Sequence, residues 1–268
     1  MKIHSTAIIN PKAKIAADVE IGPYVCIEGP AVIGKGCVIQ AHAVLSGAVH
    51  LGKNNTIGYG AIIGAPPQDR AFHPKIKSKV IIGDDNNIRE YCTIHRGTAE
   101  GSATIVGNHN FLMTGMHLGH NVKLGSHIII ANNVLLAGHA EVQDRAFIGG
   151  GAACHQFVRI GQVAIAQGVN ALTKDVPPFT IVAQSLIIGL NVIGLRRAGF
   201  NPSQRQEIKN AFKLLYRSGL NTTQALEEAR KIKWNKEGRA FFEFVEQAKK
   251  RGICDSRATA AAGNHDEE

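Results

Sequence analysis

The sequence lacks features that would place it in a membrane or give it a redox or zinc motif. No apolar stretch reaches the ~20 residues that cross a bilayer, and residues 1–20 lack the continuous apolar core of a signal peptide. We therefore predict a cytoplasmic protein without stable membrane insertion. The five cysteines form no C-x-x-C pair, which favours reduced, structural thiols. They are Cys26, Cys37, Cys92, Cys154 and Cys254.

Acidic residues are scarce toward the C-terminus. Residues 190–254 hold fourteen Lys and Arg against six Asp and Glu, whereas residues 1–189 hold fifteen against eleven. A basic surface attracts nucleic acid, anionic lipid or an acidic protein, and charge alone does not choose among them. A solvated helical surface is the simplest explanation.

Branched aliphatic residues, by contrast, recur at every sixth position. The series runs from Ile3 to Ile63 without exception, breaks near residues 65–79 and 97–104, and ends at Leu172. Of its 26 starting positions, 24 are Ile, Leu or Val, which neither a Gly-rich low-complexity chain nor period-two antiparallel strands would show. Period six is typical of a parallel β-helix in which three hexads make one coil. We therefore predict an all-β solenoid over residues 1–189, with both breaks as external loops.

The sequence changes character after residue 189. Asn201 and Pro202 form a helix start that leads to a stop at Ser218-Gly219. Two more helices are expected around 223–234 and 237–251. We predict a small α-helical domain over residues 190–254 and a disordered tail over 255–268.

Four histidines are expected to meet on the outside of the solenoid. Positions eighteen apart lie in adjacent rungs, roughly 4.8 Å apart, so His120, Gly138 and Gln156 form one column. Beside this column lie His117, His139 and His155. General base catalysis, a zinc site of three imidazoles and a structural hydrogen-bonded ladder could each use such a cluster.

Direct acyl transfer fits the general base alternative best. No Ser or Cys nucleophile lies in the column, so a covalent acyl-enzyme is not indicated. Gly138 would bring a bare backbone N–H beside the base, where it suits an oxyanion.

Several motifs resemble the acyl-carrier-protein-dependent UDP-N-acetylglucosamine O-acyltransferase family, which starts lipid A synthesis. The resemblance covers about residues 1–250. It implies a left-handed β-helix with C-terminal helices, a homotrimer with active sites between neighbouring subunits, and no cofactor or metal. The motifs are QD at 68–69, NNIRE at 86–90, TIHRGT at 93–98, H-x-x-H at 117–120, ANN at 131–133, LAGH at 136–139, HQF at 155–157, DVPP at 175–178 and GLN…GLRRAGF at 189–200.

The resemblance also implies roles for individual residues. His120 matches the general base that deprotonates the sugar 3-hydroxyl, which attacks the thioester of a 3-hydroxyacyl carrier protein, and Gly138 matches the oxyanion-stabilising amide. Gly168 matches a position that measures the acyl chain, while Asn191 and Arg197 match nucleotide contacts. The other substrate-binding positions are Gln68, Asp69, His95, His117, His139, His155 and Gln156. The acidic carrier protein suits the basic C-terminal end better than nucleic acid does.

Departures from the family pattern concern sugar recognition. Ala71 stands where the family has a substrate-binding lysine, Asn121 follows the base where aspartate is common, and Ile193 replaces a glutamate. The segment 183–191 is shorter and less polar than usual. Another nucleotide sugar as acceptor, such as a UDP-3-amino sugar, and a metal-binding or structural β-helix paralogue therefore stay as alternatives.

Overall fold

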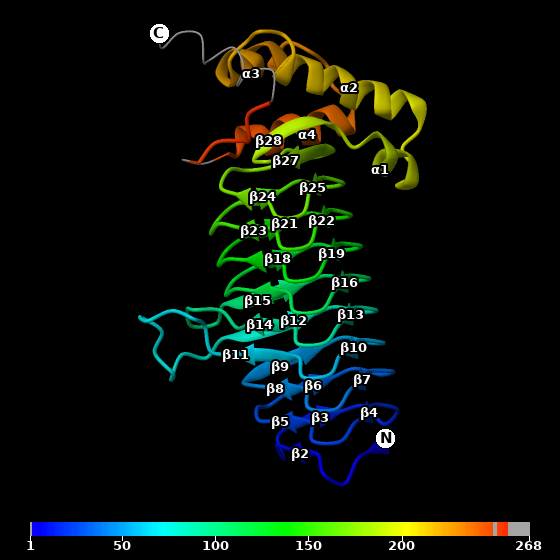
Figure 1. Cartoon of the computed structure of the whole chain (residues 1–268), viewed down its shortest axis with the longest axis vertical. Helices are drawn as coiled ribbons and strands as arrows, with labels where there is room; N and C mark the ends of the chain where they lie inside the picture. The colour runs from blue at the N-terminus through cyan, green and yellow to red at the C-terminus, as the bar shows by residue number, and fades with distance from the viewer. Residues whose placement is uncertain (1, 249–250, 257–268) are drawn as a thin grey trace.

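The computed structural model describes residues 2–248 and 251–256 and shows a tall three-sided prism capped by helices (Figure 1). Three sheets of short strands form its faces. The first sheet contains β1 (Lys2–Ile3), β4 (Glu20–Ile21), β7 (Val38–Ile39), β10 (Thr56–Ile57), β13 (Asn87–Ile88), β16 (Phe111–Leu112), β19 (Ile129–Ile130), β22 (Phe147–Ile148), β25 (Ile165–Ala166), β27 (Thr180–Ala183) and β28 (Leu186–Leu190). The second contains β2 (Ile8–Ile9), β5 (Cys26–Ile27), β8 (Val44–Leu45), β11 (Ile62–Ala65), β14 (Thr93–His95), β17 (His117–Leu118), β20 (Leu135–Leu136), β23 (Ala153–Cys154) and β26 (Ala171–Leu172). The third contains β3 (Lys14–Ile15), β6 (Val32–Ile33), β9 (Ala48–Leu51), β12 (Lys79–Ile82), β15 (Ala103–Val106), β18 (Lys123–Leu124), β21 (Glu141–Val142) and β24 (Arg159–Ile160).

Each coil takes one strand from each sheet in turn, so one hexad makes one face. Parallel pairing brings hexad residues of successive coils together, as where Ile57 lies beside Ile88 and Ile88 beside Leu112. These three side chains are fully buried. The predicted left-handed parallel β-helix followed by helices is confirmed.

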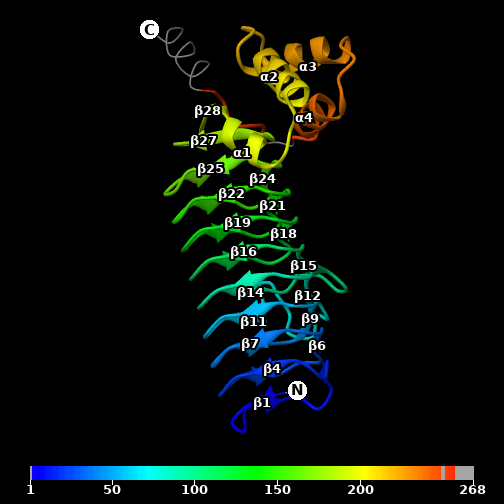
Figure 2. The same ribbon diagram turned by 90° about the vertical axis from the view of Figure 1, so that its right-hand side faces the viewer.

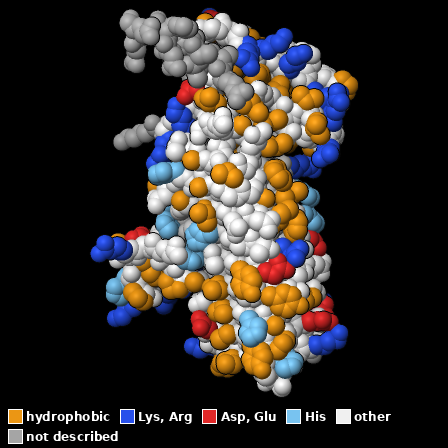
Figure 3. All heavy atoms as spheres, in the orientation of Figure 1, with side chains coloured by type: hydrophobic (Ala, Val, Ile, Leu, Met, Phe, Trp, Pro, Cys, Tyr) orange, Lys and Arg blue, Asp and Glu red, His pale blue; other side chains and the backbone are white. Residues whose placement is uncertain are grey.

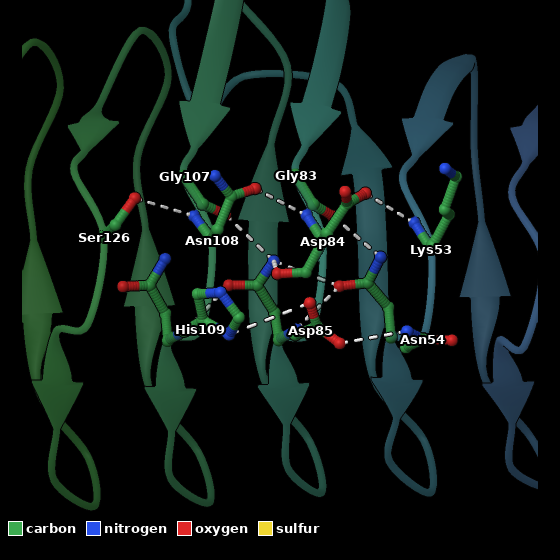
Figure 4. A network of polar contacts seen from close by, with 12 residues as sticks. Lys53, Asn54, Gly83, Asp84, Asp85, Gly107, Asn108, His109 and Ser126 are labelled. Atoms are coloured by element: carbon green, nitrogen blue, oxygen red, sulfur yellow. Dashed lines mark hydrogen bonds and ion pairs between the residues drawn. The ribbon is translucent and has the colours of Figure 1, made fainter.

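Asparagine replaces a small aliphatic residue at one corner of three successive coils. Asn55, Asn86 and Asn110 are at most 2% exposed, and each side chain donates to a backbone carbonyl in the next coil. Outside them, Asp84 accepts from Lys53 N–H at 2.7 Å, and Asp84 N–H donates to Asn108 at 2.7 Å (Figure 4). Polar ladders therefore satisfy the backbone at this corner.

Both loops leave the prism at the edge between the second and third sheets, on the left of Figure 1. The first loop, residues 66–78, joins β11 to β12, and the second loop, residues 96–102, joins β14 to β15. They contact each other, since Gly101 N–H donates to Lys77 O and Lys77 N–H donates to the Glu100 carboxylate, both at 2.9 Å. We call this edge of the prism the loop edge.

The second loop is shorter than the sequence indicated. Ala103 and Thr104 belong to strand β15, where they pair with Lys79 and Val80 of β12. Strand pairing continues past the hexad because β12 and β15 are each four residues long.

An antiparallel hairpin of β27 and β28 and four helices close the top of the prism (Figures 1 and 2). The helices are α1 (Val192–Arg197), α2 (Pro202–Tyr216), α3 (Thr222–Arg230) and α4 (Lys236–Glu246). Asn201, Asn221 and Asn235 cap the last three through their side chains. Within residues 2–248 and 251–256, no helix is long and apolar enough to cross a membrane.

Two helix boundaries and one helix differ from the prediction. Helix α3 ends at Arg230, not near 234, because the chain turns back so that the Trp234 indole donates to Ala229 O at 2.9 Å. Helix α4 ends at Glu246, and α1 was not predicted. A six-residue helix with Val and Ile on its exposed side carries no clear helical period.

The chain returns to the last coil after α4. Ile253 bridges to Asp175, and Ser256 bridges to Ile187. The prediction of disorder is therefore wrong for Asp255 and Ser256, because this pairing holds them, and residues 257–268 lie outside the described part of the chain.

A buried ion pair fixes helix α4 to the prism. Arg159 in β24 lies 2.6 Å from the Asp175 carboxylate, donates to Phe244 O at 2.9 Å, and stacks over the Phe244 ring at 4.3 Å. The two charged side chains are 15% and 5% exposed.

Candidate active site

His120 lies at the loop edge, in the turn from β17 to β18, and Gly138 lies in the same turn of the next coil. His139 N–H donates to His120 O at 2.9 Å, which places these turns in adjacent rungs. A β-carbon at position 138 would lie 2.4 Å from Cε1 and 2.5 Å from Nε2 of the imidazole. The half-buried His120 ring therefore packs on bare Gly138 backbone, and a side chain at position 138 would push the ring aside.

The Gly138 amide is available beside this ring. Within the described part of the chain, the Gly138 N–H donates no hydrogen bond. The same holds for the N–H groups of His120 and Gln156, which lie in the same turn of the neighbouring coils. Phe157 N–H donates to Gly138 O at 3.1 Å and so holds the next peptide, between Gly138 and His139, from above. A free N–H next to an imidazole is the arrangement that a developing oxyanion requires.

Asn121 orients the His120 ring from the other side. Nδ1 of His120 lies 3.0 Å from Oδ1 of Asn121. An amide oxygen accepts only, so Nδ1 donates and Nε2 keeps a lone pair for a substrate proton.

Two further histidines lie near His120: His117 precedes it in the same coil, and His95 ends strand β14 in the coil below. The rings of His95 and His117 pack edge to face, with 4.9 Å between their centroids, and His117 Nδ1 lies 2.7 Å from Thr93 Oγ1. Burial, helped by the nearby His117 and His120, lowers the pKa of His95 to about 4, and burial lowers the pKa of His117. His95 Nδ1 is buried without a partner among the described residues, so this part of the site holds one unsatisfied polar atom.

His139 lies above and beside His120. The two rings pack edge to face, with 5.2 Å between their centroids. The His139 ring also stacks on the Phe157 ring, with 4.7 Å between centroids. Burial, with the nearby His120 and Lys123, lowers the pKa of His139. Phe157 is 56% exposed and has a left-handed φ of 67°. The eighteen-residue period relates it to His139, so spacing could have singled it out.

His155 and Gln156 are exposed at the upper end of the column. His155 Nδ1 lies 3.3 Å from Gln156 O, and Arg251 donates to His155 Nε2 at 3.4 Å. Arg251 also lines a cavity of about 870 Å³ with His139 and Phe157. No sequence pattern pointed to Arg251, because it lies 96 residues after His155 and reaches it only through the returning C-terminal segment.

The first loop carries Gln68 and Asp69, both exposed. The Asp69 carboxylate accepts from Ala71 N–H at 2.9 Å and so shapes its own loop. Ala71 is exposed, and Phe72 packs under the Arg96 guanidinium at 5.3 Å.

Three predicted residues lie away from the loop edge in the single chain. Gly168 is in a turn between the first and second sheets. Arg197 is exposed on α1, which lies on the side of the prism opposite the loops (Figures 1 and 2). Asn191 is buried, caps α1 through Gly194 N–H and donates to Val163 O at 2.7 Å.

The histidine cluster does not form a metal cage. Among residues 2–248 and 251–256, no three His, Cys, Asp or Glu side chains are grouped to hold a metal ion. Figure 3 shows histidine side chains spread along the edge from which the loops project.

Known proteins resemble this chain over most of its length. A family model described as Udp N-acetylglucosamine O-acyltransferase, Domain 2, matches residues 175–254. An acyl-[acyl-carrier-protein]–UDP-N-acetylglucosamine O-acyltransferase of Thermodesulfovibrio yellowstonii is 42% identical over 257 residues, covering 94% of this chain and 99% of that protein. The chain belongs to this acyltransferase family.

Solved structures of UDP-N-acetylglucosamine acyltransferases share the fold. The Francisella novicida enzyme has a TM-score of 0.92 at 38% identity, covering 97% of this chain and 96% of that one. The Bacteroides fragilis enzyme has a TM-score of 0.89 at 41% identity, covering 94% and 99%. The prism and its helical cap are therefore those of the acyltransferase family throughout.

Proposed function

We propose that the protein transfers a 3-hydroxyacyl chain from acyl carrier protein to the 3-hydroxyl of UDP-N-acetylglucosamine, the first step of lipid A synthesis. Relatives covering nearly the whole chain carry the corresponding enzyme name. The observation that carries the mechanism is the packing of His120 on the bare Gly138 backbone at the loop edge.

The transfer proceeds directly between the two substrates. Nε2 of His120 takes the proton of the sugar hydroxyl while its oxygen attacks the thioester carbonyl carbon. The Gly138 N–H stabilises the tetrahedral oxyanion. Collapse breaks the carbon–sulfur bond, and the imidazolium returns its proton to the leaving thiolate. The thioester is already activated, so the reaction uses no cofactor.

A homotrimer supports this reaction better than the single chain. The outer face of the first sheet exposes Ile129 and Phe147, at 39% and 37%, and apolar side chains in one stripe mark an interface. Gly168 and Arg197 lie away from His120 in one chain, so a neighbouring subunit would supply them. Trimer formation predicts a solution mass of about 86 kDa, three times the 28.7 kDa chain.

Subunit mixing tests the shared site. His120→Ala and Arg197→Ala homotrimers are each expected to be impaired. Refolding the two variants together should restore part of the activity, because some sites then combine an intact His120 from one chain with an intact Arg197 from the other. A mass of one chain, or no recovery on mixing, contradicts the shared site.

The basic C-terminal helices suit the acidic carrier protein. Lys and Arg side chains gather over the helical cap in Figure 3, and Arg196, Arg205, Lys209, Lys213 and Arg217 line one cavity there. Exposed charges act through a screened field, so the KM for acyl carrier protein should rise with salt while the KM for the sugar nucleotide changes little. Equal salt sensitivity of both would contradict this docking surface.

Product formation tests the function. Purified protein incubated with 3-hydroxyacyl carrier protein and UDP-N-acetylglucosamine should yield one acylated sugar nucleotide by mass spectrometry and one free carrier thiol per product. Thiol release without acylated sugar, or no product at high enzyme concentration, contradicts the proposal.

A UDP-3-amino sugar is the second candidate acceptor. Ala71 leaves the first loop without the family lysine, and Ile193 is 65% exposed where the family has glutamate. An equal mixture of the two acceptors decides between them, because the ratio of products equals the ratio of kcat/KM values. Preference for UDP-N-acetylglucosamine excludes this candidate.

A further inference from the structure

Thr98 in the second loop contacts the side chain that orients His120. Its N–H and its hydroxyl both donate to Oδ1 of Asn121, at 3.1 and 3.0 Å. His120 Nδ1 lies 3.0 Å from the same oxygen. One amide oxygen therefore meets two groups of the second loop and the imidazole of the next coil.

The Thr98 backbone determines which way the Asn121 amide points. A backbone N–H can only donate, so the atom that it meets is the amide oxygen and not the nitrogen. The opposite orientation would place an NH₂ group against the Thr98 N–H. His120 Nδ1 consequently faces an acceptor and carries the proton, which leaves Nε2 free.

The Asn121 backbone is fixed by the strand that follows the second loop. Asn121 has a left-handed φ of 61°, and its N–H donates to Thr104 Oγ1 at 2.8 Å. The Thr104 hydroxyl donates in turn to His95 O at 2.6 Å, and Thr104 is fully buried. The second loop therefore holds the Asn121 side chain through Thr98, and the strand after that loop holds the Asn121 backbone through Thr104.

We propose that Thr98 is a positioning residue for the acyl transfer: its two donors hold the Asn121 amide so that His120 keeps its proton on Nδ1 and presents Nε2 to the substrate. This inference rests on the proposed function, in which His120 is the base. Asn121 has no charge to attract the imidazolium, so orientation is what it contributes, and the second loop makes that orientation unique.

Thr98→Val removes the hydroxyl donor while keeping the side-chain shape. Loss of one hydrogen bond corresponds to a fall in kcat of about three- to tenfold. KM for either substrate should stay unchanged, because Thr98 does not meet the reacting groups. Thr98→Ser retains both donors and should restore kcat to within about twofold of wild type, and Thr223→Val, at an exposed position in α3, is the matched control.

A double-mutant cycle with Asn121→Ala isolates the contact. Once the amide is absent, Thr98→Val should have no further effect on kcat. Three results would each overturn the proposal. They are the same three- to tenfold loss in the Asn121→Ala background, a change in KM alone, and failure of Thr98→Ser to recover kcat.

Histidine tautomers provide a readout that needs no acyl transfer. In protein labelled with ¹⁵N-histidine, the ring signals of His120 are those lost in His120→Ala. We expect the Nδ1–H tautomer in wild type, and an added Nε2–H population in Thr98→Val that grows in Asn121→Ala. An Nε2–H tautomer in wild type, or a Thr98→Val spectrum identical to wild type, refutes the positioning role. A wild-type protein that makes no acylated sugar contradicts the proposed function instead, while the tautomers still decide the role of Thr98.

Discussion

Gly138→Ala is the smallest change that reaches the proposed base. The new β-carbon would lie 2.4 Å from Cε1, 2.5 Å from Nε2 and 3.0 Å from Nδ1 of His120. Carbon contacts are comfortable from about 3.5 Å, so the imidazole must move by about 1 Å. Such a displacement of a reacting group costs roughly a hundredfold in rate, or about 2.7 kcal/mol of transition-state stabilisation.

The assay is kcat/KM for acyl transfer to UDP-N-acetylglucosamine. Because His120 is half-buried and the atoms that the new β-carbon would meet belong to its side chain, the folded state should lose little stability, which thermal unfolding checks. Thr223→Ala, at an exposed position of α3, is the control for a surface substitution and should keep wild-type kcat/KM.

Wild-type kcat/KM in Gly138→Ala would contradict this role of His120. It would mean that the chemistry tolerates a displaced imidazole, so His120 could not be the base in the position seen here. A loss explained entirely by unfolding would equally remove the geometric argument.

Three other predictions concern stability and reactivity. The pKa of His95 is about 4 in the folded state against an ordinary 6.5, so the unfolded chain binds more protons between these pH values and the free energy of unfolding falls as pH drops. In urea unfolding, wild type should lose about 2 kcal/mol more than His95→Gln between pH 7 and pH 5. The same pH dependence in both proteins would contradict this. Asp175→Asn leaves the Arg159 guanidinium uncompensated and should cost about 3 kcal/mol in the same assay, whereas an unchanged midpoint would mean that the pair adds nothing. Of the five thiols, only the half-buried Cys26 should react with a disulfide reagent in the folded protein at pH 8, because burial raises the pKa of the other four; fast reaction of more than one thiol would contradict the packing.

The sequence predicted the coil because its hexads are governed by local burial. Ile57, Ile88 and Leu112 each fill one face of one coil, so a fixed period translates directly into contacts. The same arithmetic placed His120 under Gly138 in adjacent rungs. Where pairing alters the period, as at Ala103 and Thr104 in β15, the prediction failed.

Contacts between distant segments could not be predicted in this way. Arg251 reaches His155 only because Ile253 pairs with Asp175 after four helices. The hydrogen bonds of Thr98 to Asn121 depend on the path of an irregular loop, which no periodicity describes. Short α1 likewise forms because the Asn191 side chain caps it at the end of β28.

The role of His120 as the general base is tested by the rate of acyl transfer from 3-hydroxyacyl carrier protein to UDP-N-acetylglucosamine in His120→Ala. His127→Ala is the matched control, because His127 is exposed on a different edge of the prism, where it stacks on His109. Removal of a general base predicts a loss of at least about a hundredfold in His120→Ala, with wild-type turnover in His127→Ala. Wild-type turnover in a folded His120→Ala protein would contradict the account.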